Sequence, residues 1–557
     1  MQVEILGVLR GARGPGQDMI LARLLGAKPE YTGVVEGMSG SPVYIGDKLL
    51  GSLSYRIGQF SKEPIAGITP IEQMLEVRDL PIEADGGLQT ATSPAGQTPG
   101  ASGPALDTTS DPSTLTEPAA LIEPMDTPLA MSGFSPAAIQ FWREHVSGAG
   151  LESVAAGGMG TSEAASPVSS AAARASLEPG SAISALLVRG DVEISATCTV
   201  TYMDPKQLLA CGHPVLQAGP VSLPMTTAEV ITTLASPLNA FKIINTGTTV
   251  GAFTQDRDSA IRGVLGATAR MIPMHIAVDG PGGPRKVNVE ILDLPSLTVQ
   301  AMEVVLYESL LEANASTEST SYHLTGSIDL EDFPSVPIDV WASGGESTAA
   351  PLRLALLAGE RFAALYSNGA RQGTVRGIEL HVETVPRRVD VELEAARLVS
   401  GDIVHAGDTV EVEATLRPWQ QPERNVRIAI KLPDRLDGGN LRLLVSDAAT
   451  LDRTLNQPRR RGGPANLTAV LDEARRQHSA DRIYIALLMP EAQAAWDGET
   501  LSAVPLSMAN ALEPLRTAED ISLNGESVVV AGEAPAAGVL SGFKVLNLHI
   551  DPGGGLN

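Results

Sequence analysis

Residues 33–44 read Gly-Val-Val-Glu-Gly-Met-Ser-Gly-Ser-Pro-Val-Tyr. Two short apolar stretches flank a turn in which Gly37 and Gly40 stand on either side of Ser39. Glycine adopts backbone conformations closed to other residues and allows another molecule to approach the backbone closely. It also leaves neighbouring N–H groups unobstructed, as an oxyanion hole requires. The segment therefore has two interpretations: an ordinary Gly/Ser hairpin turn, or a turn that presents a nucleophilic serine.

Trypsin-like proteases present their nucleophile on a Gly-x-Ser-Gly turn between two barrel strands. By that analogy, Ser39 is the nucleophile, and the N–H groups of Gly37 and Ser39 are the candidate oxyanion hole. Such a serine needs a base within hydrogen-bond reach, most often a histidine. Of the eight histidines, His213 is the best placed, because it follows a predicted strand and lies in the rigid sequence Gly-His-Pro. The others lie on a linker helix, within apolar strands or near the ends of elements.

The composition is that of an acidic globular protein. A chain of 557 residues, with 43% hydrophobic and 19% charged residues, predicts about three or four domains with sizeable cores. Its 40 basic and 65 acidic residues give a net charge of −25, which argues against nucleic acid or an anionic membrane as a partner. No apolar run approaches the roughly 18 residues of a membrane-spanning helix. The chain begins inside a predicted strand, with no signal peptide, as though trimmed at its start.

The sequence predicts neither a cofactor nor a metal. It contains no phosphate-binding glycine loop, no His-Glu-x-x-His and no dinucleotide fingerprint. Its two cysteines make neither a disulfide framework nor a zinc site. Cys198 and Cys211 face each other across a predicted hairpin, where two outcomes are open: a disulfide in an oxidising compartment, or two buried free thiols.

Changes in composition along the chain predict six segments. Short strands fill the first and third segments, and a flexible low-complexity linker with one short helix, capped by Ser135, separates them. Two expectations within these segments concern single elements: a short helix over Ala228–Leu234, and a strand-like stretch over Ala301–Ser309 that resembles Met19–Leu24. The segments are 1–80, which bears Ser39; 81–182, the linker; 183–300, which bears His213; 301–384, a β-rich segment that resembles a degenerate repeat; 385–456, a β-sandwich; and 457–557, an α/β region.

Two of these regions carry a resemblance to a known family. Residues 3–75 contain Gly-Met-Ser-Gly-Ser-Pro, and residues 199–291 contain Ala-Cys-Gly-His at the end of a strand. Together they resemble the bacterial stage IV sporulation protein B (SpoIVB) family, whose members are serine peptidases related to trypsin-like enzymes. The resemblance implies that Ser39 is the nucleophile, that His213 is the general base, and that the protein works outside the cytoplasm.

The chain departs from the family pattern in three ways. In the family the histidine precedes the serine, whereas here Ser39 comes first, so the two halves are permuted. The PDZ domain usual upstream is not recognisable. The position of the family's aspartate is occupied by Leu24-Leu25-Gly26. The candidates for the third member of a triad are therefore Asp256 and, alternatively, Asp18; Asp256 also fits a local Asp/Arg turn.

These observations lead to an expected fold and two expected functions. The fold is mainly β: a trypsin-like double β-barrel core, a C-terminal β-sandwich and a small α/β tail. The first function is that of a serine endopeptidase that cleaves proteins or peptides, including its own linker, through an acyl-enzyme. The alternative is a catalytically inactive peptidase-fold scaffold or binding protein of the cell envelope.

Overall fold

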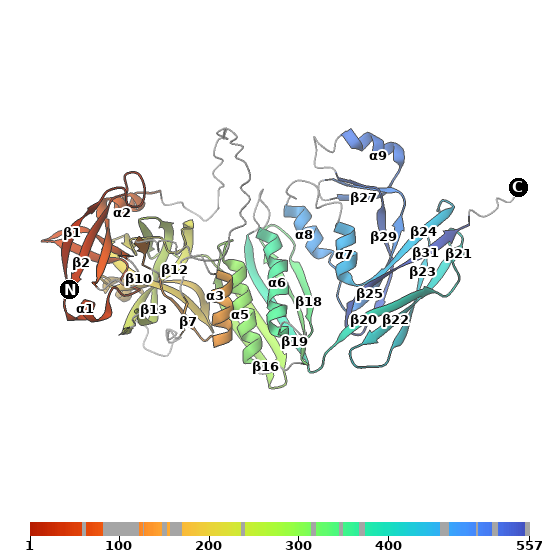
Figure 1. The fold of residues 1–557 in the computed structure, drawn as a ribbon, viewed down its shortest axis with the longest axis horizontal. Coiled ribbons are helices and arrows are strands. Elements are labelled where there is room, and N and C mark those ends of the chain that lie inside the picture. Colours follow the sequence, from red (N-terminus) through yellow and green to blue (C-terminus); the bar gives the residue numbers. More distant parts are fainter. Residues whose placement is uncertain are drawn as a thin grey trace, which may run out of the picture. The chain divides into compact units, whose positions relative to one another are not determined.

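The computed structural model shows a mainly β protein (Figure 1). It divides into two compact units, here called the N-terminal unit (1–271 with 292–294) and the C-terminal unit (272–291 with 295–557). The structure describes residues 1–57, 63–81, 122–125, 127–146, 153–155, 170–235, 240–313, 319–344, 349–366, 374–456, 467–496, 499–514 and 522–551. Of the predicted linker, 81–182, residues 82–121, 126, 147–152 and 156–169 lie outside these ranges.

The first sheet of the N-terminal unit is antiparallel and carries Ser39 on a loop at one edge; we call it the serine sheet. Alternating apolar residues such as Leu24, Leu53 and Ile68 form its buried core. Two short helices accompany it, α1 (Ala27–Thr32) and α2 (Ile71–Arg78). In spatial order the strands are β1 (Gln2–Leu9), β2 (Met19–Leu25), β5 (Ile65–Pro70), β4 (Lys48–Ile57) and β3 (Ser41–Ile45), with β6 (Ile122–Pro124) paired to β4.

Six strands of the second sheet of the N-terminal unit form a closed ring, because the last of the six also pairs with the first. We call this closed sheet the histidine ring. Its strands, all paired antiparallel, are in order β9 (Ala182–Gly190), β12 (Gly219–Leu234), β13 (Phe241–Arg257), β14 (Ala260–Leu265), β11 (Gln207–Ala210) and β10 (Glu193–Met203). Beyond β10 lie β7 (Leu129–Ser132) and β8 (Ser153–Ala155).

Two expectations for this unit need correction. The helix predicted over Ala228–Leu234 is the second half of strand β12, paired with β13. The run Val-Ile-Thr-Thr at 230–233 explains the difference, since β-branched residues favour strands. Part of the predicted linker is also an ordered component of the unit, since β7 pairs with β10. The short helix predicted after Ser135 is confirmed as α3 (Pro136–Val146), and it buries Trp142. Short helix α4 (Ser170–Ala175) also falls within the linker segment.

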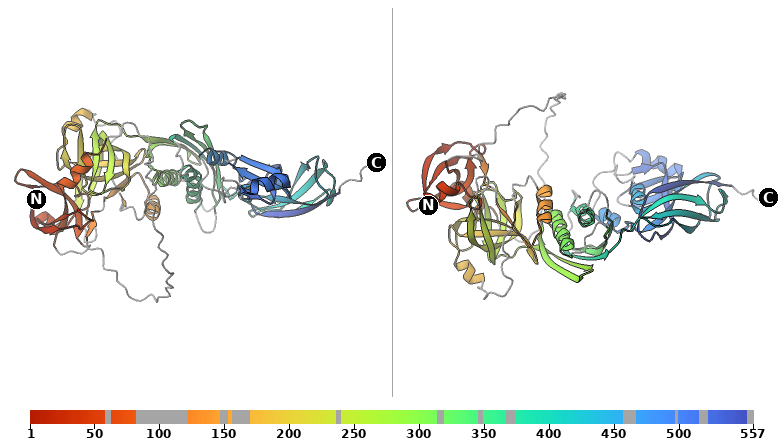
Figure 2. Two further views of the ribbon diagram at one scale, coloured as in Figure 1. Left: turned by 90° about the horizontal axis from the view of Figure 1, so that it is seen from above. Right: turned by 60° about the horizontal axis from the view of Figure 1, so that its bottom comes forward.

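The C-terminal unit begins with a sheet and two helices. Helices α5 (Thr298–Glu312) and α6 (Ala350–Tyr366) lie side by side, and α6 packs on the sheet (Figure 2). The stretch Ala301–Ser309, expected to resemble Met19–Leu24, lies inside α5, so the predicted repeat is wrong. A fully buried helix and a buried strand are both apolar throughout, and periodicity does not separate them. The strands are in order β18 (Val336–Ala342), β17 (Ser321–Leu330), β19 (Val375–Val385), β15 (Met271–Gly280) and β16 (Gly283–Leu292).

Two further sheets of this unit share one hydrophobic core, as expected for a β-sandwich. The sandwich extends beyond the predicted 385–456, because strands from the last hundred or so residues complete both sheets. One sheet contains β23 (Arg424–Lys431), β22 (Thr409–Pro418), β20 (Asp390–Leu398) and β30 (Val539–Ser541); the other contains β21 (Ile403–Val404), β31 (Phe543–Ile550), β24 (Gly439–Ser446), β25 (Arg482–Met489) and β29 (Ser527–Pro535).

Smaller elements complete the C-terminal unit. A minor sheet contains β27 (Glu499–Val504), β26 (Ala492–Trp496) and β28 (Ser522–Asn524). The helices are α7 (Ala448–Asn456), α8 (Leu467–Arg475) and α9 (Leu506–Leu512). In the described parts of the chain, no helix is both long and apolar enough to cross a membrane.

Candidate active site

Ser39 lies on the loop between helix α1 and strand β3, and the two glycines beside it shape this loop. Gly37 has a φ of 85° and Gly40 a φ of 92°, values that disfavour any residue with a side chain. At Gly40 space is also short, because a Cβ atom there would lie 1.9 Å from the carbonyl oxygen of Thr199. The glycines thus allow the loop to lie directly against strand β10.

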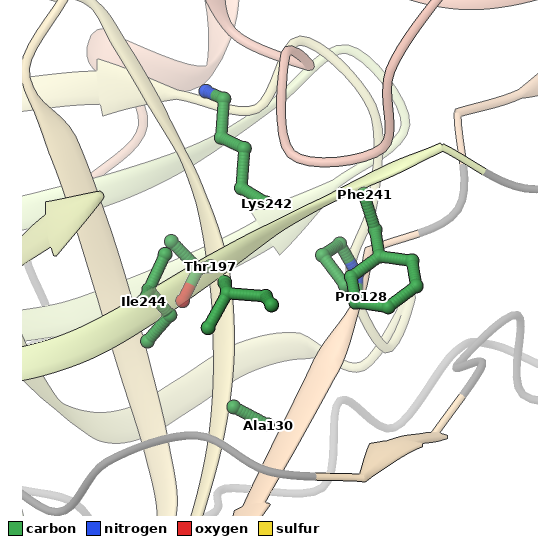
Figure 3. A pocket seen from close by; sticks show the side chains of 7 residues that line it. Pro128, Ala130, Thr197, Phe241, Lys242 and Ile244 are labelled. Carbon is green, nitrogen blue, oxygen red and sulfur yellow. The ribbon is translucent and has the colours of Figure 1, made fainter. Parts of the chain in front are cut away.

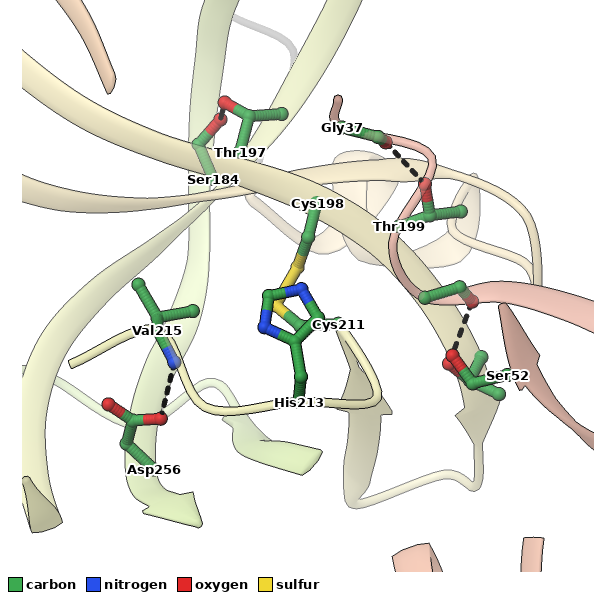
Figure 4. Close-up of a disulfide and its surroundings, with 12 residues drawn as sticks. Gly37, Ser52, Ser184, Thr197, Cys198, Thr199, Cys211, His213, Val215 and Asp256 are labelled. Atoms are coloured by element: carbon green, nitrogen blue, oxygen red, sulfur yellow. Dashed lines mark hydrogen bonds between the residues drawn. A yellow bond between two sulfur atoms is a disulfide. The ribbon is translucent and has the colours of Figure 1, made fainter. Parts of the chain in front are cut away.

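Strand β10 binds the serine loop through two threonines on the same face. The N–H of Thr199 donates to the carbonyl oxygen of Ser39 at 2.8 Å, and its hydroxyl donates to the carbonyl oxygen of Gly37 at 3.1 Å (Figure 4). The Thr201 hydroxyl donates to the carbonyl oxygen of Gly40 at 2.7 Å. The serine sheet and the histidine ring therefore meet at this loop, inside one unit.

The groups that an acyl transfer would need from this loop are not engaged in other bonds. Ser39 is fully buried, and its hydroxyl has no hydrogen-bond partner among the described residues. The backbone N–H groups of Gly37 and Ser39 likewise donate to no acceptor among the described residues. A buried polar group without a partner costs about 1–3 kcal/mol, so this arrangement needs an explanation beyond stability.

The histidine loop follows strand β11 and is tied down on several sides. A disulfide joins Cys198 to Cys211, which decides between the two outcomes left open by the sequence. Cys211 and Gly212 both adopt positive φ, 65° and 75°. The Cys211 N–H donates to the carbonyl oxygen of Thr199 at 3.2 Å, and the carbonyl oxygen of Gly212 accepts from the Thr69 hydroxyl at 2.7 Å. His213 therefore follows a turn anchored to both sheets.

The His213 ring is buried, with 1% of its surface exposed. Its Nδ1 lies 2.7 Å from the carbonyl oxygen of Pro214. Because a carbonyl only accepts, we assign the proton to Nδ1 and the lone pair to Nε2. Nε2 has no hydrogen-bond partner among the described residues. Burial lowers the pKa of His213 to about 4, so the ring is neutral at neutral pH, with Nε2 ready to accept a proton.

The serine loop and the histidine loop both bind to one residue of strand β10. Thr199 binds Ser39 through its N–H and Cys211 through its carbonyl oxygen. Ser39 Oγ and His213 Nε2 nonetheless make no hydrogen bond to each other, since each lacks a partner within the described chain. The structure thus brings the predicted nucleophile and base loops together in one unit and leaves the bond between the two side chains unmade.

The expectation of a carboxylate behind His213 needs correction. Asp256 is buried, and one of its oxygens accepts the N–H of Val215 at 2.8 Å (Figure 4). The other accepts the N–H of Leu216 at 2.6 Å. Burial raises the pKa of Asp256, and these backbone bonds oppose the rise. Asp18 accepts the N–H of Gly11. The group that holds His213 Nδ1 is the Pro214 carbonyl, and Asp256 instead fixes the segment that follows.

Lys242, on strand β13, is a contributor that the sequence did not reveal. Its Nζ donates to the carbonyl oxygen of Gly37 at 2.6 Å. Burial, and next the positive charge of Lys28, lower the pKa of Lys242 to about 8. The only sequence feature that points to this role of Lys242 is its place in the apolar run Phe-Lys-Ile-Ile at 241–244, where a lysine is unusual. Its stem borders a pocket lined by Pro128, Ala130, Thr197, Phe241, Lys242, Ile243 and Ile244 (Figure 3).

No part of the described chain gathers three or more His, Cys, Asp or Glu side chains in an arrangement that could hold a metal ion. No family model, no curated protein and no solved structure matches the sequence or the fold.

Proposed function

We propose that this protein is a serine endopeptidase in which Ser39 is the nucleophile and His213 the general base. One observation carries the proposal: the Ser39 hydroxyl, the His213 Nε2 atom and the N–H groups of Gly37 and Ser39 are all without partners in the described chain, on two loops joined through Thr199. These are the groups that acyl transfer requires. The motif resemblance to SpoIVB peptidases supports the same assignment.

The reaction would follow the usual course of a serine hydrolase. Ser39 Oγ attacks the substrate carbonyl carbon while its proton passes to His213 Nε2, and the N–H groups of Gly37 and Ser39 stabilise the oxyanion. The C–N bond then breaks as His213 returns the proton to the leaving amine. Water, activated by the same histidine, hydrolyses the acyl-enzyme. The Pro214 carbonyl orients the ring but carries no full charge, so it stabilises an imidazolium less than a carboxylate would.

The described conformation would be a resting form. Ser39 and His213 are 0% and 1% exposed, so a substrate chain needs one of the loops to move before it reaches them. Hydrogen bonds in resting active sites are often long and tighten only when substrate binds. Substrate entry would therefore both open the site and bring Oγ and Nε2 together.

The proposal extends to the type of core, the location of the protein and its class of substrate. A closed antiparallel ring beside a second β-sheet, with the nucleophile loop where they meet, supports a two-barrel core of trypsin-like type. The Cys198–Cys211 disulfide supports an oxidising, extracytoplasmic location. The substrate class would be proteins or peptides.

A second candidate is an inactive scaffold that keeps the fold as a binding module. The observation that favours it is the missing hydrogen bond between Ser39 and His213.

Labelling with a fluorophosphonate discriminates between the two functions, because only an activated serine reacts rapidly. We expect S39A to abolish labelling and H213A to slow it about 100-fold or more. S41A, two positions further on at the start of strand β3, is the matched control and should react like wild type. Equal labelling of wild type, S39A and H213A would rule out the peptidase and favour the scaffold.

A further inference from the structure

The peptide unit between Gly37 and Met38 is fixed at both ends. Its carbonyl oxygen accepts from Lys242 Nζ at 2.6 Å and from the Thr199 hydroxyl at 3.1 Å. Its N–H, which belongs to Met38, donates to the carbonyl oxygen of Val35 at 3.0 Å. A peptide unit is planar, so these bonds set the orientation of the whole group.

The two neighbouring peptide units carry the N–H groups assigned to the oxyanion hole, that of Gly37 on one side and that of Ser39 on the other. The hinge between them includes Gly37, whose φ of 85° lies in a region where glycine moves easily to other conformations. Without a restraint on the central unit, both N–H groups would change direction as Gly37 rotates.

Lys242 supplies that restraint with its whole side chain. A Cβ atom at Gly37 would lie 3.3 Å from Lys242 Cδ, so the aliphatic stem packs on the glycine while the ammonium holds the carbonyl oxygen. Nζ extends away from Ala130 and Ile244 (Figure 3). An ammonium donor forms a stronger bond to a carbonyl than a neutral donor does.

We propose that Lys242 is a positioning residue for the oxyanion hole: by holding the Gly37 carbonyl it keeps the N–H groups of Gly37 and Ser39 aimed at one point. This inference rests on the proposed peptidase function. It adds a residue from strand β13 to a site whose other members come from the serine loop and the histidine loop.

The test measures how fast a fluorophosphonate modifies Ser39 in the full chain, with the maximal rate constant separated from the half-saturating concentration. We expect K242M to lower the maximal rate about tenfold or more, as loss of oxyanion donors does, with little change in half-saturation. K242R, which retains a charged donor, should recover most of the rate. K206M, an exposed lysine on the turn between β10 and β11, is the control and should match wild type.

The outcomes separate the inference from the function on which it rests. K242M reacting at the wild-type rate, while S39A does not react, would overturn the role of Lys242 and leave the peptidase standing. A change confined to half-saturation, or equal losses in K242M and K242R, would also overturn it. Absence of Ser39-dependent labelling in wild type would overturn both. Melting curves check that each variant is folded, and K242Q, with a neutral donor, replaces K242M if that variant does not fold.

Discussion

The N–H of Thr199 donates to the carbonyl oxygen of Ser39 over 2.8 Å, and the neighbouring residue, Cys198, is half of the disulfide to Cys211. The nucleophile loop therefore binds to the strand that is covalently linked to the histidine loop. Residues that are far apart in the chain are held together through one short piece of β10. Changes on either side of this piece should alter the geometry of both loops.

Gly212 is the position where substitution should cost most. A Cβ atom there would lie 2.0 Å from Ser54 Oγ and 2.3 Å from Ser52 Oγ, and φ is 75°. Gly16 has the same φ with nothing within 4 Å. G16A should therefore report backbone strain alone, about 1 kcal/mol, whereas G212A should lose about 3 kcal/mol or more. Equal losses in chemical denaturation would show that the close approach to the serines does not matter.

Asp256 should stabilise the histidine loop through its two backbone bonds. In D256N one carboxylate oxygen becomes an NH₂ group, which would face the N–H of Val215 or Leu216 with no acceptor between them. We expect a loss of about 1–3 kcal/mol in the free energy of unfolding, together with slower labelling of Ser39. D258N, at a neighbouring exposed carboxylate that accepts a side-chain bond from Gln217, is the control. A D256N protein as stable as D258N would contradict this role.

His213 should make stability depend on pH in the acid range. Its pKa is about 4 in the folded protein and about 6.5 in an unfolded chain. Between these values the unfolded chain binds the proton more readily, so stability falls as pH drops from about 6.5 to about 4, by about 3 kcal/mol for this residue. H213Q should lack this component, whereas H145Q, at an exposed position of the same unit, should retain it. Parallel pH profiles for wild type and H213Q would contradict the assignment.

The same depressed pKa of His213 should also appear in the pH dependence of the reaction rate. We expect the rate of any Ser39-dependent reaction to fall on the acid side with a midpoint near pH 4, because the base remains neutral down to that value.

The sequence predicts much of this architecture, since the relevant signals are local. Glycine at 37 and 40 marks positions of positive φ, alternation marks the strands, and Ser135-Pro136 marks the start of α3. The group that holds His213 Nδ1, the carbonyl of Pro214, has no such local signal in the sequence. Nothing near His213 in the sequence indicates that its ring turns to the carbonyl of the next residue, so the sequence predicts a carboxylate as its partner. Lys242 was missed for a related reason: its acceptor lies on a loop about two hundred residues away.

The two wrong elements have a common physical cause. Over Ala228–Leu234 and Ala301–Ser309, local pattern does not decide between helix and strand, and the partner does. The first stretch pairs with β13; the second packs beside α6. In the first stretch the β-branched residues at 230–233 favour the same strand that β13 pairs with, whereas in the second the tertiary contacts alone decide.

The order in which the sandwich strands appear has a consequence for protein synthesis. Strand β20 pairs with β30, and strand β24 pairs with β31. One edge of each of these early strands is therefore unpaired until residues 539–550 have been synthesised. While the ribosome is still translating the intervening segment, the nascent chain carries unpaired strand edges, which are templates for association with other chains. This part of the protein can therefore reach its native state only after translation has passed residue 550, and until then its open strand edges can be bound by a chaperone.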